Sequence, residues 1–241
     1  MKNTYSFFGL TLFAMNAFCA TPASSQDSTK KVQLKVTADL VSSYVWRGVK
    51  ATNTPNFQPT MAIVKNNFEA GVWGSTDFSG DYKEVDLNTS YTIGALKMGV
   101  TDYNWTFQKP YFGYRHSNTD HIIEGSLSFL GTSTMPLSVS VNTMFYGSDK
   151  KSSNPNKNAY STYIELGYPI SSSVSLFMGA TPGDGYYGDG YGKSGGFAFV
   201  NLGVTGTRSL KISDVYSLPI KATFGVNPQQ EDLYLVFGIT F

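Results

Sequence analysis

Residues 231–241 read EDLYLVFGITF, and apolar side chains occupy every second position of this stretch. In a β-strand, successive side chains point to opposite faces, so residues two apart share a face. The alternation therefore predicts a strand with one apolar face, which either a protein core or lipid must cover. The apolar stripe consists of Leu233, Leu235, Phe237, Ile239 and Phe241.

The same period of two returns along most of the chain and predicts twelve strands. No segment of useful length has the helical spacing i, i+3, i+4, i+7, so the fold is expected to be all-β. The predicted strands cover residues 32–47, 57–65, 67–76, 83–93, 95–107, 119–130, 136–147, 158–169, 173–181, 195–205, 217–227 and 232–241.

The predicted connections alternate between short and long. Four of them are tight, at Asn66, Gly94, 131–135 and 170–173, and most of the others are longer and polar. The segment 206–216 breaks this rule, because it is long where a tight turn is expected. Short turns at one end and long loops at the other are typical of an outer-membrane β-barrel.

The composition separates this barrel from a water-soluble one. Charged residues make up 15% of the chain, against about 25% in typical soluble domains. The polar positions of the strands hold mainly Ser, Thr, Asn and Gly, whereas a water-facing surface usually carries more charge. We therefore expect a transmembrane antiparallel up-and-down barrel of about twelve strands, apolar outside and polar inside. The 18 basic and 17 acidic residues balance, which argues against a nucleic-acid partner.

The N-terminus has the layout of a secretory signal peptide, with Lys2, an apolar run and small residues near Ala20. We expect residues 1–20 to be this signal, with cleavage somewhere between 19 and 25. Residues 21–31 form a polar leader, and 32–241 form the barrel. The sole cysteine, Cys19, lies in the signal, so disulfides and cysteine-ligated metals are not expected in the mature chain.

Three tryptophans, Trp46, Trp73 and Trp105, lie near the ends of the first, third and fifth predicted strands, just before long loops. The indole ring is apolar, but its N–H needs a partner, and it therefore favours the membrane–water interface. The positions predict that all three tryptophans lie at the outer interface. Chance placement of three tryptophans at strand ends in a soluble sandwich is the alternative.

The last strand resembles the signal that the barrel-assembly machinery of the outer membrane recognises, which is a terminal Phe preceded by alternating apolar residues. The stripe from Leu233 to Phe241 matches this pattern. The resemblance implies that the machinery is a partner during assembly, and that the last strand then pairs with the first. Such closure removes both edges of the sheet.

Three internal stretches resemble the TorF-type porins, a family of small Gram-negative outer-membrane proteins that is named mostly by prediction. They are LVSSYVWRGV at 40–49, FEAGVWGST at 68–76 and EVDLNTSYT at 84–92. The closing stretch 218–241 is similar to versions from Bacteroidetes-type bacteria. The resemblance spans most of the mature chain and implies an outer-membrane barrel, but it implies little about the substrate.

Strand parity places a set of charged side chains on the polar, inner face. Acids outnumber bases in this set, which favours cations if a water-filled path exists. Arg47 is the residue most suspected of a role inside the barrel, and it could equally bridge an acid on a neighbouring strand. The predicted inner residues are Lys35, Asp39, Arg47, Glu84, Asp86, Glu124, Glu165 and Lys221.

Two other patterns carry weaker hypotheses. GDGYYG at 183–188 and GYGKSG at 190–195 fit G-x-G-x-x-G, but a strand follows them where a nucleotide-binding motif needs a helix, so we interpret them as a Gly/Tyr surface loop. His116 and His121 are the only histidines, and a lipid hydrolase of the outer membrane could use one of them. Since no nucleophile elbow accompanies them, a solvated loop is the stronger interpretation.

The sequence therefore predicts an outer-membrane channel for passive passage of small polar solutes. A closed barrel whose extracellular loops bind a partner or a surface glycan is the main alternative, and a lipid hydrolase is a remote one. We expect no enzymatic activity, no cofactor and no metal. The expected partners are outer-membrane lipid, the assembly machinery and, if the barrel is open, small polar solutes.

Overall fold

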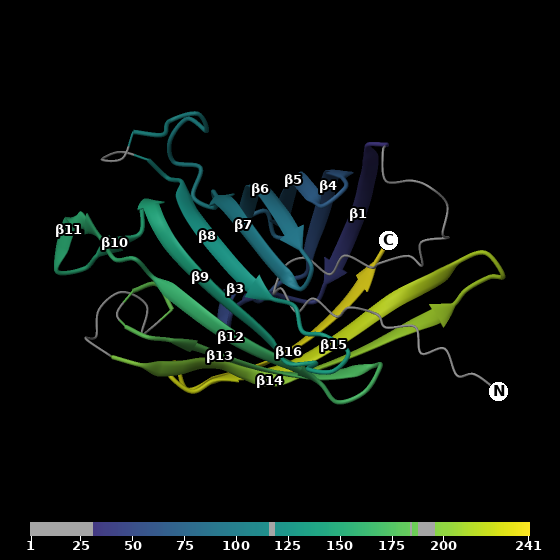
Figure 1. Cartoon of the computed structure of the whole chain (residues 1–241). Coiled ribbons are helices and arrows are strands. Elements are labelled where there is room, and N and C mark those ends of the chain that lie inside the picture. Colours follow the sequence, from purple (N-terminus) through teal and green to yellow (C-terminus); the bar gives the residue numbers. More distant parts are fainter. Residues whose placement is uncertain (1–30, 116–118, 184, 188–195) are drawn as a thin grey trace.

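The computed structural model describes residues 31–115, 119–183, 185–187 and 196–241, and these form one closed barrel of twelve antiparallel strands (Figure 1). The predicted signal peptide lies outside the described residues. No helix in the described part of the chain has the length and apolar character needed to cross a membrane.

The barrel strands follow one another in sequence order around the ring, and the last one closes on the first. This confirms the predicted all-β, up-and-down class and the strand number. The barrel strands are β1 (Gln33–Val41), β4 (Asn56–Lys65), β5 (Phe68–Asp77), β6 (Lys83–Ile93), β7 (Leu96–Tyr103), β8 (Ile122–Phe129), β9 (Ser138–Gly147), β12 (Thr162–Pro169), β13 (Val174–Thr181), β14 (Ala198–Lys211), β15 (Ser217–Asn227) and β16 (Asp232–Thr240).

The connections fall into two groups at opposite ends of the barrel. At the short-turn end, the first two turns begin with Asn66 (φ 54°) and Gly94 (φ 58°). Both residues accept a left-handed backbone at low cost, which is why two-residue hairpins favour them. The loop end carries two small ribbons, β2 (Tyr44–Trp46) with β3 (Val49–Thr52) and β10 (Lys150–Lys151) with β11 (Asn154–Asn158).

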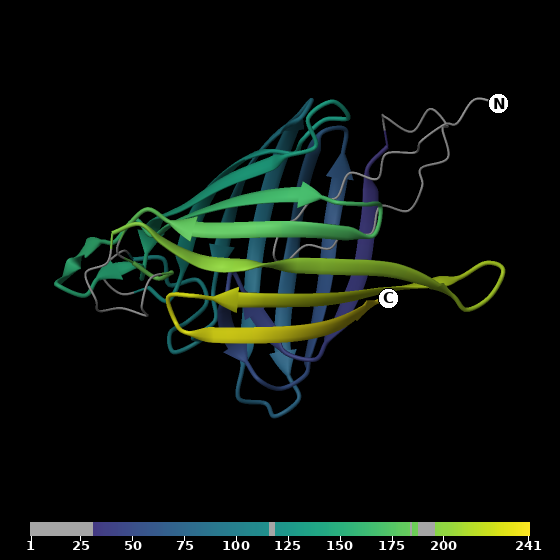
Figure 2. The same cartoon turned by 90° about the horizontal axis from the view of Figure 1, so that it is seen from below.

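The segment 206–216 was predicted as a long loop, and this prediction is wrong. β14 continues to Lys211 and pairs with β15 down to the register pair Lys211↔Ser217. The connection is therefore only 212–216, and the turn at this end is short like the others. The long hairpin of β14 and β15 extends past its neighbours at the short-turn end (Figure 2).

The two faces of the wall differ as the sequence predicts. Large apolar side chains such as Met61, Phe224 and Leu235 are exposed on the outside. Polar side chains such as Gln58 and Asn142 are buried on the inside. This is the reverse of a soluble barrel, and the twelve-strand barrel is consistent with one that sits in an outer membrane.

The first predicted strand, 32–47, was expected to be continuous, but β1 ends at Val41. Its last residues pair with β4 on one side and with β16 on the other. The chain then bends at Ser42 and Ser43 and enters the ribbon β2–β3. This departure creates the candidate site, because it brings residues 44–52 inside the barrel.

Candidate functional site: an inward hairpin held by a buried ion pair

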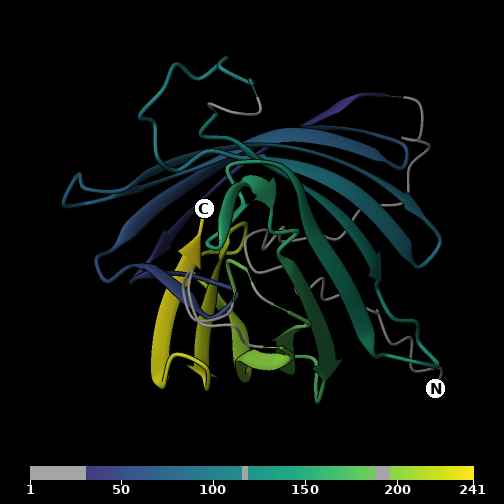
Figure 3. The ribbon, with the colours of Figure 1, turned by 90° about the vertical axis from the view of Figure 1, so that its left-hand side faces the viewer.

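The hairpin β2–β3 packs inside the loop end of the barrel. Tyr44, Trp46 and Arg47 retain 4–5% of their accessible surface. Tyr44 and Trp46 belong to the main buried cluster, together with inward residues of the wall such as Trp73 and Tyr163. Figure 3 faces this end and shows the ring of strands around the interior.

The tip of the hairpin is a tight turn at Arg47 (φ 51°) and Gly48 (φ 82°). Two successive left-handed residues define the type I′ turn that suits two-residue hairpins. At the second position only glycine fits, because a Cβ on Gly48 would lie 2.1 Å from the carbonyl oxygen of Val200. The Gly48 carbonyl in turn accepts a hydrogen bond from Asn227 Nδ2 at 3.1 Å. The tip therefore touches β14 and the end of β15.

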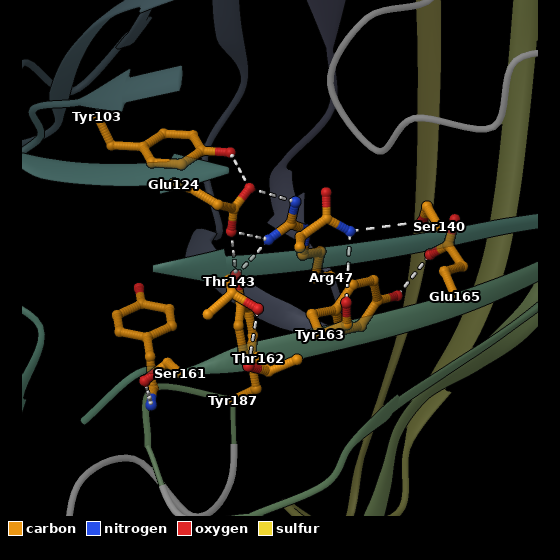
Figure 4. A network of polar contacts seen from close by, with 12 residues as sticks. Arg47, Tyr103, Glu124, Ser140, Thr143, Ser161, Thr162, Tyr163, Glu165 and Tyr187 are labelled. Atoms are coloured by element: carbon orange, nitrogen blue, oxygen red, sulfur yellow. Dashed lines mark hydrogen bonds and ion pairs between the residues drawn. The ribbon is translucent and has the colours of Figure 1, made fainter. Parts of the chain in front are cut away.

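Arg47 makes a two-pronged ion pair with Glu124 of β8 (Figure 4). Its Nη1 and Nη2 lie 2.6 and 2.8 Å from Glu124 Oε2 and Oε1. The Tyr103 hydroxyl donates to Oε1 at 3.0 Å, and the Tyr187 hydroxyl donates to Oε2 at 3.1 Å. Bidentate charge-assisted bonds of this kind are among the strongest in proteins.

Aromatic rings complete the surroundings of the guanidinium. Arg47 Cζ lies 4.7 Å from the Trp46 ring centroid and 5.0 Å from that of Tyr163. A planar guanidinium stacks on such rings, which lysine does less well. The pair is almost fully buried, with exposures of 5% for Arg47 and 2% for Glu124. Removal of one partner would leave a buried charge without compensation, which costs about 3–5 kcal/mol.

The hairpin reaches wall strands around most of the ring. Tyr44 lies 5.7 Å from Trp73, and Trp46 lies 5.3 Å from Tyr103, measured between ring centroids. Lys50 Nζ lies 2.8 Å from Asp232 Oδ2. The hairpin thus spans the interior. The wall residues it meets are Trp73 on β5, Tyr103 on β7, Glu124 on β8, Tyr163 on β12, Val200 on β14, Asn227 on β15 and Asp232 on β16.

The interface prediction for the tryptophans is wrong in this conformation. Trp46 and Trp73 are 5% and 4% exposed and lie in the interior cluster, and Trp105 packs against that cluster. Trp46 points inward because the hairpin that carries it folds inward. Trp73 points inward because it shares the inner face of β5 with Ser75, which is also buried.

Of the eight charged residues predicted for the inner face, five are buried inside the barrel. Glu84, Asp86 and Glu165 are buried, together with Arg47 and Glu124. The remaining three are partly exposed. Lys35 is 3.5 Å from Glu69, and Asp39 accepts a hydrogen bond from Thr240 at 2.5 Å. Lys221 occupies an inner position of β15, two residues from Thr223.

Tyrosine hydroxyls donate hydrogen bonds to three of the buried carboxylates, those of Glu84, Glu124 and Glu165. The Tyr82 hydroxyl donates to Glu84 at 2.6 Å, and the Tyr163 hydroxyl donates to Glu165. Burial, followed by the charge of Glu84, raises the pKa of the Tyr82 hydroxyl in its loop, so it remains a donor. The same two causes raise the pKa of Tyr186 to about 12. Tyrosine thus lines an acidic interior without adding charge.

The glycine motifs at 183–188 and 190–195 were interpreted as a surface loop, but two of their described residues are inside. Tyr187 is fully buried against Trp46 and Tyr163, and Tyr186 packs on the same cluster. The Gly/Tyr-rich stretch around these two tyrosines has no alternation of polar and apolar residues, so the sequence did not predict that they are buried. Most residues of the two glycine motifs lie outside the described residues.

His121 sits in a separate cluster near the loop end. Its Nδ1 lies 2.7 Å from Asp102 Oδ1, and its Nε2 contacts the Tyr111 carbonyl oxygen. Tyr114 stacks on the ring with centroids 4.1 Å apart. Among the described residues, no serine or threonine hydroxyl is recorded within hydrogen-bond distance of the ring. His116 lies outside the described residues, as does Ser117.

Comparison of the sequence with models of known protein families and with curated proteins finds no match. The interpretation of the site therefore depends on its own geometry. That geometry is a polar, acid-rich inner wall whose loop end is filled by a hairpin, and the hairpin is fastened by one buried ion pair.

Proposed function

We propose that this chain is an outer-membrane barrel that passes small polar solutes when the β2–β3 hairpin leaves the interior, and that it is closed in the conformation described above. The observation that carries the proposal is the Arg47–Glu124 pair, which joins the tip of the hairpin to the far wall. A permanent plug would need no buried charges, since apolar residues fill a core at least as well.

Three features support a membrane location. The outside of the barrel is apolar, the loops are longer at one end, and the N-terminus has the layout of a signal peptide. Outer-membrane lipid and the assembly machinery are the corresponding partners. The strand–turn patterns at 40–49, 68–76 and 84–92 support membership of the TorF-type porins, which we include in the proposal.

The inner wall supports a preference for cations. Of the eight charged residues predicted for it, Asp39, Glu84, Asp86, Glu124 and Glu165 are acids and three are bases. Rings and clusters of carboxylates favour cation passage. The proposed activity is passive and needs neither an enzymatic step nor a cofactor.

Single-channel conductance in planar bilayers tests the proposal. The refolded mature chain should open rarely, and Glu124→Gln should raise its open probability at least about tenfold, because it leaves Arg47 unpaired. A salt gradient should shift the reversal potential toward cation selectivity. The charge exchange Arg47→Glu with Glu124→Arg should restore closure, whereas Glu231→Gln, at a turn, should change nothing.

A chain that is folded and heat-modifiable on gels but electrically silent in every variant would contradict passage. The second candidate would then hold, which is a closed barrel whose loops bind a partner or a surface glycan. Its specific support is the set of aromatic side chains exposed on the loops at that end. They include Phe78, Phe112 and Tyr160.

A further inference from the structure

The seam between β1 and β16 is the shortest in the barrel. Its register comprises Asp39↔Thr240, Leu40↔Ile239 and Val41↔Gly238, whereas nine pairs join β1 to β4. Ser42 extends the seam by two hydrogen bonds to one residue: its N–H donates to the Phe237 carbonyl at 2.8 Å, and the Phe237 N–H donates to Ser42 Oγ at 3.0 Å. Beyond Ser42 the chain turns inward. The loop-end half of β16, residues 232–236, therefore borders the place where β1 would continue.

The inward hairpin is a continuation of the β1–β4 hairpin. The register of β1 with β4 reaches Val41↔Asn56, and that of β2 with β3 starts at Tyr44↔Thr52. Between them, both legs bend at small or constrained residues, Ser42–Ser43 on one leg and 53–55 on the other. Strands β1 to β4 thus form one long hairpin, and its two strands bend at the same distance from the tip.

We propose that residues 42–55 have a second position, in which this hairpin straightens into the wall and residues 42–47 pair with residues 232–237 of β16. The inference rests on the proposed function, because it supplies the motion that opens the inner path. The occupant of the β16 edge is then a segment of this same chain.

The register specifies the partners in the straight position. The two strands are antiparallel, so the residue number rises by one on β1 as it falls by one on β16. If this register continues beyond Val41, Tyr44 lies opposite Leu235 and Trp46 lies opposite Leu233. Even-numbered residues of β1 such as Leu34 and Val36 point outward, as do Leu233 and Leu235. Tyr44 and Trp46 would therefore face outward, at the depth that aromatic residues favour.

The odd-numbered residues fit the inner face equally well. Continuation of the register sets Arg47 opposite Asp232, both on the inner side. In the bent position Asp232 already pairs with a base of the same hairpin, Lys50. Arg47 would thus exchange Glu124 for another acid and keep a partner in both positions. An element with two stable positions needs a set of favourable contacts in each of them, and this exchange of acidic partners supplies such contacts.

Cysteine cross-linking in the folded barrel tests the second position. In a Cys19→Ser background, Trp46→Cys with Leu233→Cys should form a disulfide under mild oxidation. In the bent position these two residues are on opposite sides of the wall, one buried and one 60% exposed. The matched control is Trp46→Cys with Phe237→Cys, which is outward and similarly exposed but four residues out of register.

We expect the first pair to cross-link at least about tenfold faster when Glu124→Gln is added, since this loosens the bent position. The control pair should stay reduced in both backgrounds. Failure of the first pair to cross-link in either background, or equal rates for the two pairs, would overturn the proposal. If the Trp46 variants do not reach the heat-modifiable form, Tyr44→Cys with Leu235→Cys makes the same test.

Conductance of the cross-linked barrel separates this inference from the proposed function. A cross-linked barrel that stays open supports both. A cross-linked barrel that stays silent keeps the second position but contradicts passage of solutes. Conductance that rises with Glu124→Gln while the register-matched pair remains reduced would keep passage and overturn the straight hairpin.

Discussion

At the scale of single residues, Arg47 and Gly48 hold the hairpin inside the barrel. Arg47 supplies the charge that fastens the hairpin, and Gly48 supplies a backbone that can approach β14. The alternation of side chains along the first predicted strand placed Arg47 inside the barrel. An acid on a neighbouring strand was one expected partner for it. Its actual partner, Glu124, belongs to β8, which lies across the barrel from β1 in strand order. Register reasoning covers only adjacent strands, so no sequence argument could identify this pair.

Gly48→Ala should destabilise the hairpin, because its Cβ would overlap the Val200 carbonyl and the residue has φ +82°. We expect a loss of about 2–4 kcal/mol in the free energy of unfolding in urea, from strain and overlap together. Gly80→Ala is the matched control. Gly80 has φ +83°, but nothing lies within 4 Å of its added Cβ. Equal losses for both variants would contradict the close approach.

At the scale of elements, the last strand shows which structural features the alternation of apolar residues predicts. The stripe Leu233, Leu235, Phe237 and Phe241 is exposed on the outside of the barrel, as its alternation predicted. Phe241 exchanges backbone hydrogen bonds with Ala38 at the seam. Alternation also described residues 32–47 well, yet the structure bends this stretch at Ser42. A period of two states which residues share a face, but it does not state where the strand leaves the wall.

Phe241→Ala should reduce assembly of the barrel in cells more than it reduces the stability of the refolded barrel. The side chain fits the expected assembly signal, and its burial in the isolated chain is small, with 58% exposed. The measurement is the heat-modifiable fraction in outer membranes, compared with urea unfolding of the refolded chain in detergent. Phe112→Ala, on an exposed loop, is the control. An equal effect of both substitutions on assembly would contradict a signal in the last strand.

At the scale of the whole molecule, the two faces of the wall decide which solvent surrounds it. Apolar side chains such as Phe224 and Leu176 point outward, and buried polar ones such as Asn142 and Ser175 point inward. An inverted barrel of this kind would expose its apolar surface to water in solution. In the proposed membrane location, lipid would cover that surface, and its burial would contribute to the stability of the barrel.

Phe224→Lys should destabilise the barrel in bilayers by about 2–4 kcal/mol if the side chain lies near the middle of the membrane. Phe224 is 46% exposed in the isolated chain and lies within β15. Val215→Lys is the control, because Val215 is 96% exposed in the turn at the short-turn end. Unfolding in phospholipid vesicles measures the difference between them. Comparable losses for both lysines would argue against a lipid-facing position of Phe224.

The sequence by itself determined the all-β class, the twelve strands, the two ends with different connections and the face on which most wall residues lie, although not that of Trp73. These properties follow from local periodicity and turn chemistry, which depend only on neighbouring residues. The tertiary structure alone decided that residues 44–52 fill the interior and that Trp46, Tyr187 and Glu124 meet Arg47 there. Such contacts join residues far apart in the chain and depend on the closed shape of the wall, which no local pattern contains.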